Sequence, residues 1–338
     1  MDDQRIPVTI ITGFLGSGKT TLLNNLIKKY TNKKFAIIEN EFGEIGLDGG
    51  LIVGANENIF ELANGCICCS LNDDFYKAIN QLLEGQYVFN HLLVETTGIA
   101  DPDAIIKAFL SSEDIQMQFR LDSVICLADA VNMEDLIDEQ PEVRKQLALS
   151  DIVLLNKIDS IHLDYAYELK RTIKEVNPMA EVYPVAHADI SNIDILDTFS
   201  FSGKAIEKST LAFRNLTITK MKSVNQPSVV TGKKEHHHDI TSEGFSIPGS
   251  FDLGHFSLWM QNFLHFNSET IFRVKGIVSF DEMPERYIFH AVRSTYMFET
   301  GDLWGEENRF SKLIFIGKKI DRDKLENNLY QLLFKPEK

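Results

Sequence analysis

Short apolar runs alternate with amphipathic segments through residues 1–200 of the chain. The runs are rich in branched side chains and apolar without alternation, which is typical of strands buried on both faces of a sheet. Six such strands are expected, at Ile6–Thr12, Phe35–Asn40, His91–Thr96, Ser123–Asp129, Asp151–Lys157 and Glu181–His187. Strands that alternate with helices predict an α/β domain with a mostly parallel sheet flanked by helices.

The pattern changes beyond this region, and we expect a smaller α+β domain over residues 211–338, since a chain of 338 residues is long enough for two domains. Residues 223–250 are rich in polar residues, glycine and proline, and we interpret them as a long loop or hairpin connection that contains His236, His237 and His238. After it we expect a helix at 256–264, strands at 272–280, 287–298 and 312–317, and a closing helix at 321–334.

Charge and hydropathy exclude several classes of partner. The net charge is −15, from 34 Lys and Arg against 49 Asp and Glu, so no basic surplus is present to neutralise a nucleic-acid backbone. No apolar run approaches the ~20 residues that a membrane-spanning helix needs, and the first residues lack the pattern of a secretory signal. We therefore expect a cytoplasmic protein without nucleic-acid or membrane partners.

A glycine-rich sequence, GFLGSGKTT, directly follows the first expected strand. Gly13, Gly18, Lys19 and Thr20 fit the phosphate-loop pattern G-x-x-x-x-G-K-[ST]. Glycines let the backbone N–H groups wrap the phosphates, and the start of the following helix adds its dipole. Lys19 would reach the β- and γ-phosphates, and the Thr20 hydroxyl would hold Mg²⁺. A chance glycine-rich turn is the alternative, and the strand-loop-helix context argues against it.

A second motif, N-K-x-D, stands at the end of a later expected strand as Asn156, Lys157 and Asp159. A carboxylate accepts hydrogen bonds from N1 and the 2-amino group of guanine, whereas adenine presents an acceptor at N1. The motif therefore predicts GTP and GDP as ligands. An ordinary Asn-Lys loop is the alternative, which the position of the motif in a phosphate-loop domain disfavours.

The segment LLVETTG brings Glu95 and Gly98 to the carboxyl edge of the expected sheet, where α/β proteins bind ligands. Glu95 would position Mg²⁺ through water or orient the attacking water, and the Gly98 amide would contact the γ-phosphate. The alternative is that Glu95 caps a turn.

Three of the four cysteines, Cys66, Cys68 and Cys69, lie within four residues. In a cytosolic chain such a cluster indicates metal or redox chemistry. Neighbouring side chains of an extended strand point to opposite faces, so Cys66 and Cys68 form the better pair, joined by Cys69 if the backbone turns. Glu39 and Glu44, in the acidic segment ENEFGEIGLD, are candidates for the remaining ligands.

Two thiolates with carboxylate or imidazole ligands favour Zn²⁺, with Co²⁺ as an alternative. Packed, inert thiols are the competing interpretation, and we assign Cys126 to the core on that ground. His236, His237 and His238 are either an auxiliary metal-loading tract or solvated loop residues with adventitious affinity.

Five motifs in order, GFLGSGKTTLL, ENEFGEIGLD, GCICC, ETTGIADP and LLNKID, resemble the CobW family of GTP-dependent metallochaperones, which is related to the nickel chaperones of urease and hydrogenase maturation. RVKGIVSF and RFSKLIFIGKKID are similar to the family's C-terminal domain. The resemblance implies a GTPase that binds a transition metal at C-x-C-C and uses its nucleotide state to control delivery of the metal to a client metalloprotein.

Carried over by motif, the resemblance assigns phosphate binding to Gly16, Ser17, Gly18, Lys19, Thr20 and Thr21. It further implies that Glu95 and Asp48 serve Mg²⁺ or water, and it associates Glu39, Glu44 and Cys68 with the metal. The main hypothesis is a zinc metallochaperone. The alternative is a GTP-gated interaction switch that assists metalloenzyme or cofactor assembly without carrying metal, and a small-molecule kinase is disfavoured by N-K-x-D. The identity of the client and the pairing of two chains as a homodimer are left open.

Overall fold

A computed structural model of the protein describes residues 4–40, 59–64, 71–85, 88–200 and 239–334. The chain divides into two compact units, one comprising Met1–Ile173 with Ala180–Phe199 and the other Lys174–Met179 with Ser200–Lys338. The predicted domain start at residue 211 and the three consecutive histidines lie outside the described residues. Within the described ranges, no helix has the length and apolar character needed to span a membrane.

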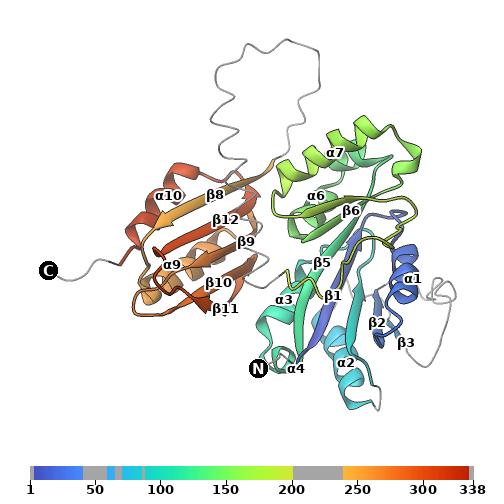
Figure 1. The fold of residues 1–338 in the computed structure, drawn as a ribbon, viewed down its shortest axis with the longest axis horizontal. Helices are drawn as coiled ribbons and strands as arrows, with labels where there is room; N and C mark the ends of the chain where they lie inside the picture. The colour runs from blue at the N-terminus through green and yellow to red at the C-terminus, as the bar shows by residue number, and fades with distance from the viewer. Residues whose placement is uncertain (1–3, 41–58, 65–70, 86–87, 201–238, 335–338) are drawn as a thin grey trace, which may run out of the picture. The chain divides into compact units, whose positions relative to one another are not determined.

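The first unit contains a parallel sheet, which has seven strands in the described part of the chain, in the order β3-β2-β4-β1-β5-β6-β7 (Figure 1). The strands are β1 (Ile6–Gly13), β2 (Phe35–Asn40), β3 (Ile59–Asn64), β4 (His91–Glu95), β5 (Phe119–Asp129), β6 (Ile152–Asn156) and β7 (Glu181–Pro184). The helices are α1 (Lys19–Lys29), α2 (Leu71–Glu84), α3 (Asp103–Ser111), α4 (Glu113–Gln118), α5 (Met133–Glu139), α6 (Pro141–Leu149) and α7 (Leu163–Val176). The predicted α/β class and the six predicted strands are confirmed.

The central strand β1 places the loop that follows it at the point where the strand order reverses, between β4 and β5. All of its residues from Val8 to Gly13 are buried. Helix α1 begins after this loop and buries Leu22, Leu23 and Leu26 in the core cluster of the sheet. Each fully buried aliphatic side chain contributes about 1.5–3 kcal/mol, so the start of α1 is fixed by its packing.

The sequence patterns did not identify β3 and α2. Strand β3 reads IFELAN, in which Glu61 interrupts the apolar run, and it pairs with β2 alone at the edge of the sheet. A strand at an edge needs a shorter apolar run than a strand buried on both faces, so its pattern is weaker.

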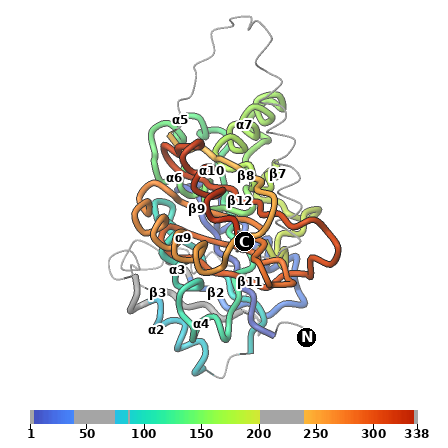
Figure 2. The backbone as a smooth tube through the Cα atoms, turned by 90° about the vertical axis from the view of Figure 1, so that its left-hand side faces the viewer, coloured from blue at the N-terminus to red at the C-terminus, as the bar shows by residue number. Residues whose placement is uncertain are grey.

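The second unit contains an antiparallel sheet, which has five strands in the described residues, in the order β11-β10-β9-β12-β8. These are β8 (Ile240–Pro248), β9 (Ile271–Val278), β10 (Glu285–Val292), β11 (Thr295–Leu303) and β12 (Phe310–Lys318). Helices α9 (Leu253–Phe266) and α10 (Arg322–Gln331) share one core cluster with the sheet (Figures 1 and 2). The predicted smaller α+β domain is confirmed.

Two predictions for this unit were wrong. Residues 240–248, interpreted as part of a long loop or hairpin connection, form the strand β8, because Phe245 and Ile247 reach the core while their neighbour Ser246 is exposed. The predicted strand 287–298 is a hairpin of β10 and β11, which turns at Arg293, whose φ is 57°. The turn consists of the polar pair Arg293 and Ser294 between two apolar runs, and it contains no glycine, proline or asparagine that would mark a hairpin in the sequence.

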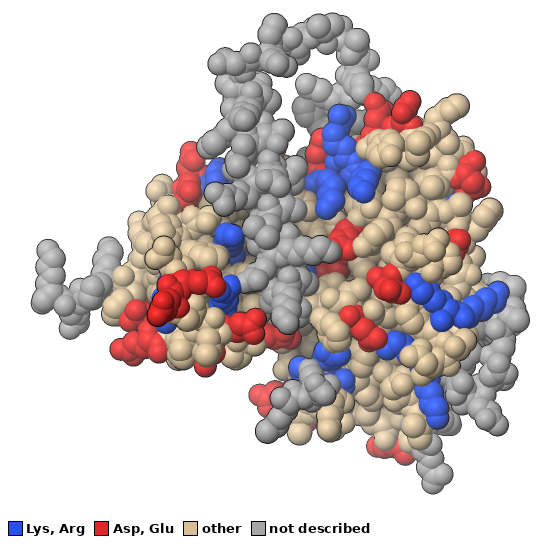
Figure 3. Space-filling view, in the orientation of Figure 1, with Lys and Arg blue, Asp and Glu red and all other residues tan. Residues whose placement is uncertain are grey.

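Charged side chains of both signs are interspersed over the described residues. On the face drawn in Figure 3, acidic and basic groups alternate in small groups over both units, without a broad basic area among the described residues.

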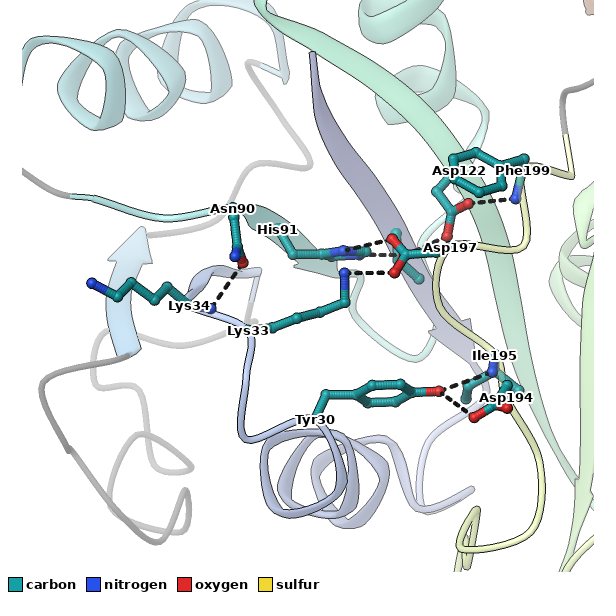
Figure 4. A network of polar contacts seen from close by, with 11 residues as sticks. Tyr30, Lys33, Lys34, Asn90, His91, Asp122, Asp194, Ile195, Asp197 and Phe199 are labelled. Atoms are coloured by element: carbon teal, nitrogen blue, oxygen red, sulfur yellow. Dashed lines mark hydrogen bonds and ion pairs between the residues drawn. The ribbon is translucent and has the colours of Figure 1, made fainter. Parts of the chain in front are cut away.

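A buried polar network lies at the amino-terminal edge of the first sheet (Figure 4). His91 Nε2 is 2.9 Å from Thr9 Oγ1, which is 3.5 Å from Asp122 Oδ2. Asp197 joins the network, because its carboxylate is 2.7 Å from Lys33 Nζ and 3.8 Å from His91 Nδ1. The segment that carries Asp197 is therefore held to the sheet by charged and polar contacts.

Burial shifts the pKa values of two groups in this network, and each shift favours the neutral form of the side chain. Desolvation lowers the pKa of His91 to about 3, with the positive charge of Lys33 acting in the same direction. Desolvation raises the pKa of Asp122 to about 6, although the Phe199 N–H donates a hydrogen bond of 2.7 Å to its carboxylate. His91 is thus neutral in the folded protein at neutral pH.

The variants His91→Gln and Asp122→Asn should separate the titrations of these two groups. Below pH 6.5 the unfolded chain protonates His91 and the folded chain does not, so His91 lowers stability as the pH falls toward 3. Between pH 6 and 3.8 Asp122 is protonated only in the folded chain, so it raises stability as the pH falls. The two effects offset each other in the wild type.

The free energy of unfolding of His91→Gln should therefore rise relative to wild type between pH 6 and pH 4, by up to about 1.4 kcal/mol per pH unit. Urea denaturation at pH 4, 5, 6 and 7 measures this difference. In the matched variant Asp122→Asn, relative stability should instead decline over the same range. Parallel curves for His91→Gln and wild type would contradict the assignment.

Candidate nucleotide site

The loop between β1 and α1 has the backbone of a phosphate cradle. Gly13, Gly16 and Gly18 have φ values of 142°, 73° and 108°, which other residues rarely adopt. A Cβ on Gly13 would lie 2.4 Å from the Leu127 carbonyl oxygen, and one on Gly18 would lie 2.7 Å from Asn156 Nδ2. Glycine is therefore required at both positions by conformation and by space.

The polar groups of this loop fit an anion. Helix α1 starts with Gly18 as N-cap, without a side-chain cap or an acidic residue in its first turn, so its positive end is open to a ligand. Lys19 Nζ donates to the Gly13 carbonyl oxygen at 3.1 Å. Ser17 is fully buried, and its Oγ has no hydrogen-bond partner in the part of the chain that the structure describes. Phosphate oxygens would be suitable acceptors for the ammonium and hydroxyl groups.

Asn156, the first residue of N-K-x-D, lies beneath the phosphate loop. Its Nδ2 donates to the Ser17 carbonyl oxygen at 2.8 Å, and its Oδ1 accepts from the Ala188 N–H at 2.8 Å. The side chain is almost fully buried. Asn156 thus connects the phosphate loop, the end of β6 and the loop after β7.

Lys157 is held by an acidic residue that sequence reasoning missed. Its Nζ lies 2.8 Å from Asp129 Oδ2, and Asp129 also accepts from the Val131 N–H at 3.0 Å and Asn132 Nδ2 at 2.9 Å. Burial alone would raise the pKa of Asp129, but these donors outweigh it and the pKa lies below its ordinary value. An acidic residue ending the predicted strand Ser123–Asp129 was the available signal.

Asp159, the last residue of N-K-x-D, lies in the short 3-10 turn Ile158–Ser160 and is partly exposed. Its carboxylate is 3.9 Å from His187 Nε2. His187 and Ala188 have φ values of 52° and 49°, in the left-handed region. This loop after β7 was not recognised from the sequence, because no local pattern distinguishes it from an ordinary strand end.

The segment after β4 is fastened to the phosphate loop. The Thr96 N–H donates to the Ile11 carbonyl oxygen at 2.9 Å, and the Thr96 hydroxyl donates to the Thr12 hydroxyl at 3.0 Å. A Cβ on Gly98 would lie 2.5 Å from the backbone nitrogen of Leu15, so only glycine allows this approach. The predicted residue Gly98 therefore lies against the phosphate loop.

The strand ends place the motifs in a row. Glu95, at the end of β4, is the register partner of Ile11 in β1 and of Glu39 in β2. Asn40 and Asn64, the last residues of β2 and β3, are partners of each other. The acidic segment and the cysteine cluster thus follow neighbouring strand ends at the edge that carries the phosphate loop.

Most of the predicted metal ligands lie outside the described residues, namely Cys66, Cys68, Cys69 and Glu44, as does Asp48. Glu39 is described by its backbone position in β2. The described residues contain no group of three or more His, Cys, Asp or Glu side chains that could hold a metal ion. Cys126 is buried in the core as predicted, and burial raises the pKa of its thiol to about 12.

Comparison with known proteins shows similarity over both units. Residues 7–184 match the family model described as the CobW/HypB/UreG nucleotide-binding domain, and residues 240–333 match the cobalamin synthesis protein cobW C-terminal domain. The chain is 33% identical to the zinc chaperone YjiA of Escherichia coli strain K12, over 95% of this chain and 96% of that protein. It is 27% identical to the zinc-regulated GTPase metalloprotein activator 1 of Schizosaccharomyces pombe, over 94% and 83%.

The fold is also similar to a solved structure. The crystal structure of Zn(II)-bound YjiA GTPase from Escherichia coli gives a TM-score of 0.70 with 27% sequence identity, covering 98% of this chain and 100% of that one. The similarity therefore extends along nearly the whole length of both proteins.

The variant Asn156→Ala should destabilise the fold and the nucleotide site together. It removes two buried hydrogen bonds and orphans the Ser17 carbonyl and the Ala188 N–H. We expect a loss of roughly 2–3 kcal/mol in the free energy of unfolding and at least tenfold weaker GDP binding. Urea denaturation and fluorescent-GDP titration measure the two effects.

Asn25→Ala is the matched control. Asn25 Nδ2 also contacts this loop, at the Ala188 carbonyl oxygen, but it makes no contact with the phosphate loop that the structure records. GDP affinity should change less than twofold in this variant. Equal GDP affinities for Asn156→Ala and Asn25→Ala would rule out the bridging role of Asn156.

Proposed function

Because the chain belongs to the CobW family of P-loop GTPases, we propose that it is a GTP-hydrolysing metallochaperone that carries zinc at its C-x-C-C motif and couples delivery to a client metalloprotein to its nucleotide state. One observation supports this most strongly. The strand order β3-β2-β4-β1 sets the flanks of the cysteine cluster and the phosphate loop at the same edge. With about 4.8 Å between neighbouring strands, the ends of β3 and β1 are about 15 Å apart.

The nucleotide side of the proposal rests on the phosphate loop and N-K-x-D. Lys19 would exchange the Gly13 carbonyl for phosphate oxygens, and the Asp159 carboxylate would accept from the guanine base. Magnesium-bound GTP would supply the γ-phosphate whose presence distinguishes the two nucleotide states. Thr20, Glu95 and Asp48 would hold the ion or the attacking water, with Glu95 lying one strand from β1.

The metal side rests on the chemistry of its donors. Cys66, Cys68 and Cys69 offer thiolates, and Glu39 and Glu44 offer carboxylates, a mixed set that suits Zn²⁺ and also accepts Co²⁺. The relatives named zinc chaperone and zinc-regulated GTPase support zinc as the cargo. A client metalloprotein would receive the ion when the geometry of these ligands changes with nucleotide hydrolysis.

Zinc affinity should depend on the nucleotide. We expect zinc to bind at least fivefold more tightly to the protein with a non-hydrolysable GTP analogue than with GDP, because the proposal has zinc released after GTP is hydrolysed. Competition titration with a zinc-chelating dye in both states measures the ratio.

Cys68→Ser controls for zinc bound elsewhere, and it should weaken binding in both states. Equal zinc affinities in the two nucleotide states would refute the coupling. If Cys68→Ser leaves client activation intact, the alternative function as an interaction switch without cargo is favoured.

Asp159→Asn should change the base preference from guanine to xanthine. The carboxamide loses the paired acceptors that N1–H and the 2-amino group need, and its N–H can instead donate to the 2-oxo group of xanthine. We expect GDP affinity to fall at least 100-fold and XDP affinity to exceed it. Competition against fluorescent GDP tests both nucleotides.

Ser160→Ala is the matched control. The Ser160 hydroxyl donates to Asp159 Oδ2 at 3.3 Å, and its removal should change GDP affinity less than threefold. Unaltered base preference in Asp159→Asn would contradict guanine recognition by this residue.

A further inference from the structure

A buried glutamine of α6 contacts the turn that contains Gly98. Gln146 Nε2 lies 3.2 Å from the Gly98 carbonyl oxygen and 3.2 Å from the Ala100 carbonyl oxygen. Both neighbours are acceptors, so the side-chain amide must present its NH₂ group to them. The turn is closed by a hydrogen bond of 3.0 Å from the Ala100 N–H to the Thr97 carbonyl oxygen.

The amide is held by these two donated bonds. Gln146 is 1% exposed, and its Oε1 has no hydrogen-bond partner among the described residues. An apolar side chain of similar volume would avoid the cost of that unpaired oxygen, which is about 1–3 kcal/mol. Helix α6 is a firm base for the contact, because Val143, Leu147 and Leu149 are buried in the core.

The opposite side of the same turn lies on the phosphate loop. Thr96 is bonded to Ile11 and Thr12 at the end of β1, and Gly98 approaches the backbone of Leu15 too closely for any side chain. The turn Thr97–Ala100 is therefore clamped between the phosphate loop and Gln146. Any displacement of Gly98 breaks the hydrogen bonds to the glutamine.

We propose that Gln146 is a positioning residue of the nucleotide cycle, which holds the Thr97–Ala100 turn where its backbone meets the γ-phosphate. The inference rests on the proposed GTPase function. It adds to that function the side chain that holds the turn in position for contact with the γ-phosphate. GTP then binds without the entropic cost of ordering the turn, whereas GDP, which does not reach the turn, is indifferent to the clamp.

The test compares nucleotide affinities of the full chain in Gln146→Met and Lys145→Met. Methionine preserves the length of Gln146 and removes both donors. Lys145 is the neighbouring residue of α6, and its Nζ contacts the same segment through the Asp101 side chain at 3.3 Å. Affinities for GDP and for GMPPNP, each with Mg²⁺, are measured by calorimetry, together with kcat and KM for GTP hydrolysis and the melting temperature.

We expect Gln146→Met to bind GMPPNP about tenfold more weakly and GDP within twofold of wild type, and to lower kcat, while Lys145→Met changes neither affinity more than twofold. Gln146→Glu, which is isosteric but accepts rather than donates when ionised, should show the same selective loss. Equal weakening of both nucleotides would assign Gln146 a structural role only and overturn the inference. Tighter GMPPNP binding would overturn it by showing that the clamp holds the turn away from the phosphate.

A measurement on the wild-type protein covers the case in which the variants do not fold. Hydrogen–deuterium exchange of the peptide spanning residues 96–101 should be slow already without nucleotide, and fast exchange there would refute the inference. If wild type binds GDP and GMPPNP but Gln146→Met keeps their affinity ratio, the inference fails and the proposed function stands. If wild type binds neither nucleotide, the proposed function itself fails.

Discussion

Two hydrogen bonds of the Asn156 carboxamide hold together the edge of the first sheet that carries the phosphate loop. It joins three segments that are distant in sequence, since from the end of β6 it donates to the carbonyl of Ser17 and accepts from the amide of Ala188 in the loop after β7. Gly18 exists as glycine partly because a Cβ there would meet this amide at 2.7 Å. A buried amide with both ends bonded is costly to disturb, because each orphaned partner loses its own hydrogen bond. The phosphate loop, the end of β6 and the loop after β7 are thereby one structural unit.

Helix α1 extends this unit toward the opposite edge of the sheet. It begins at the phosphate loop, and Lys29 in its last turn donates to the Ile190 and Ile193 carbonyl oxygens and pairs with Asp194. Just beyond the helix, Lys33 holds Asp197 in the network of Figure 4. The segment from His187 to Phe199 is thus attached along α1 and by Lys33 just beyond it.

Sequence patterns predicted those features that depend on local periodicity or a fixed motif. Six of the seven described parallel strands, the phosphate-loop motif and N-K-x-D are of this kind, because buried strands need apolar runs and phosphate needs glycine and lysine at set spacing. The contacts of Gln146 were not predictable in this way, and the local signal for those of Asp129 was only its position at the end of a predicted strand. Gln146 meets Gly98 across 48 positions of the chain, and only the packing of α6 beside β1 and β5 brings them together. Strand β8 was missed for a related reason, since its pairing with β12 compensates for a polar sequence.

The loop after β4 occupies the position through which the two candidate sites would communicate. β4 lies between β1, which leads into the phosphate loop, and β2, whose end leads into the acidic segment. Its terminal Glu95 is therefore the register partner of Ile11, on the side of the phosphate loop, and of a candidate metal ligand, Glu39, on the other side. Coupling is reciprocal, so a metal that prefers one nucleotide state must raise affinity for that nucleotide by the same factor. The proposed clamp on Gly98 would then contribute to both equilibria, because it would hold the Thr97–Ala100 turn in place before either ligand binds.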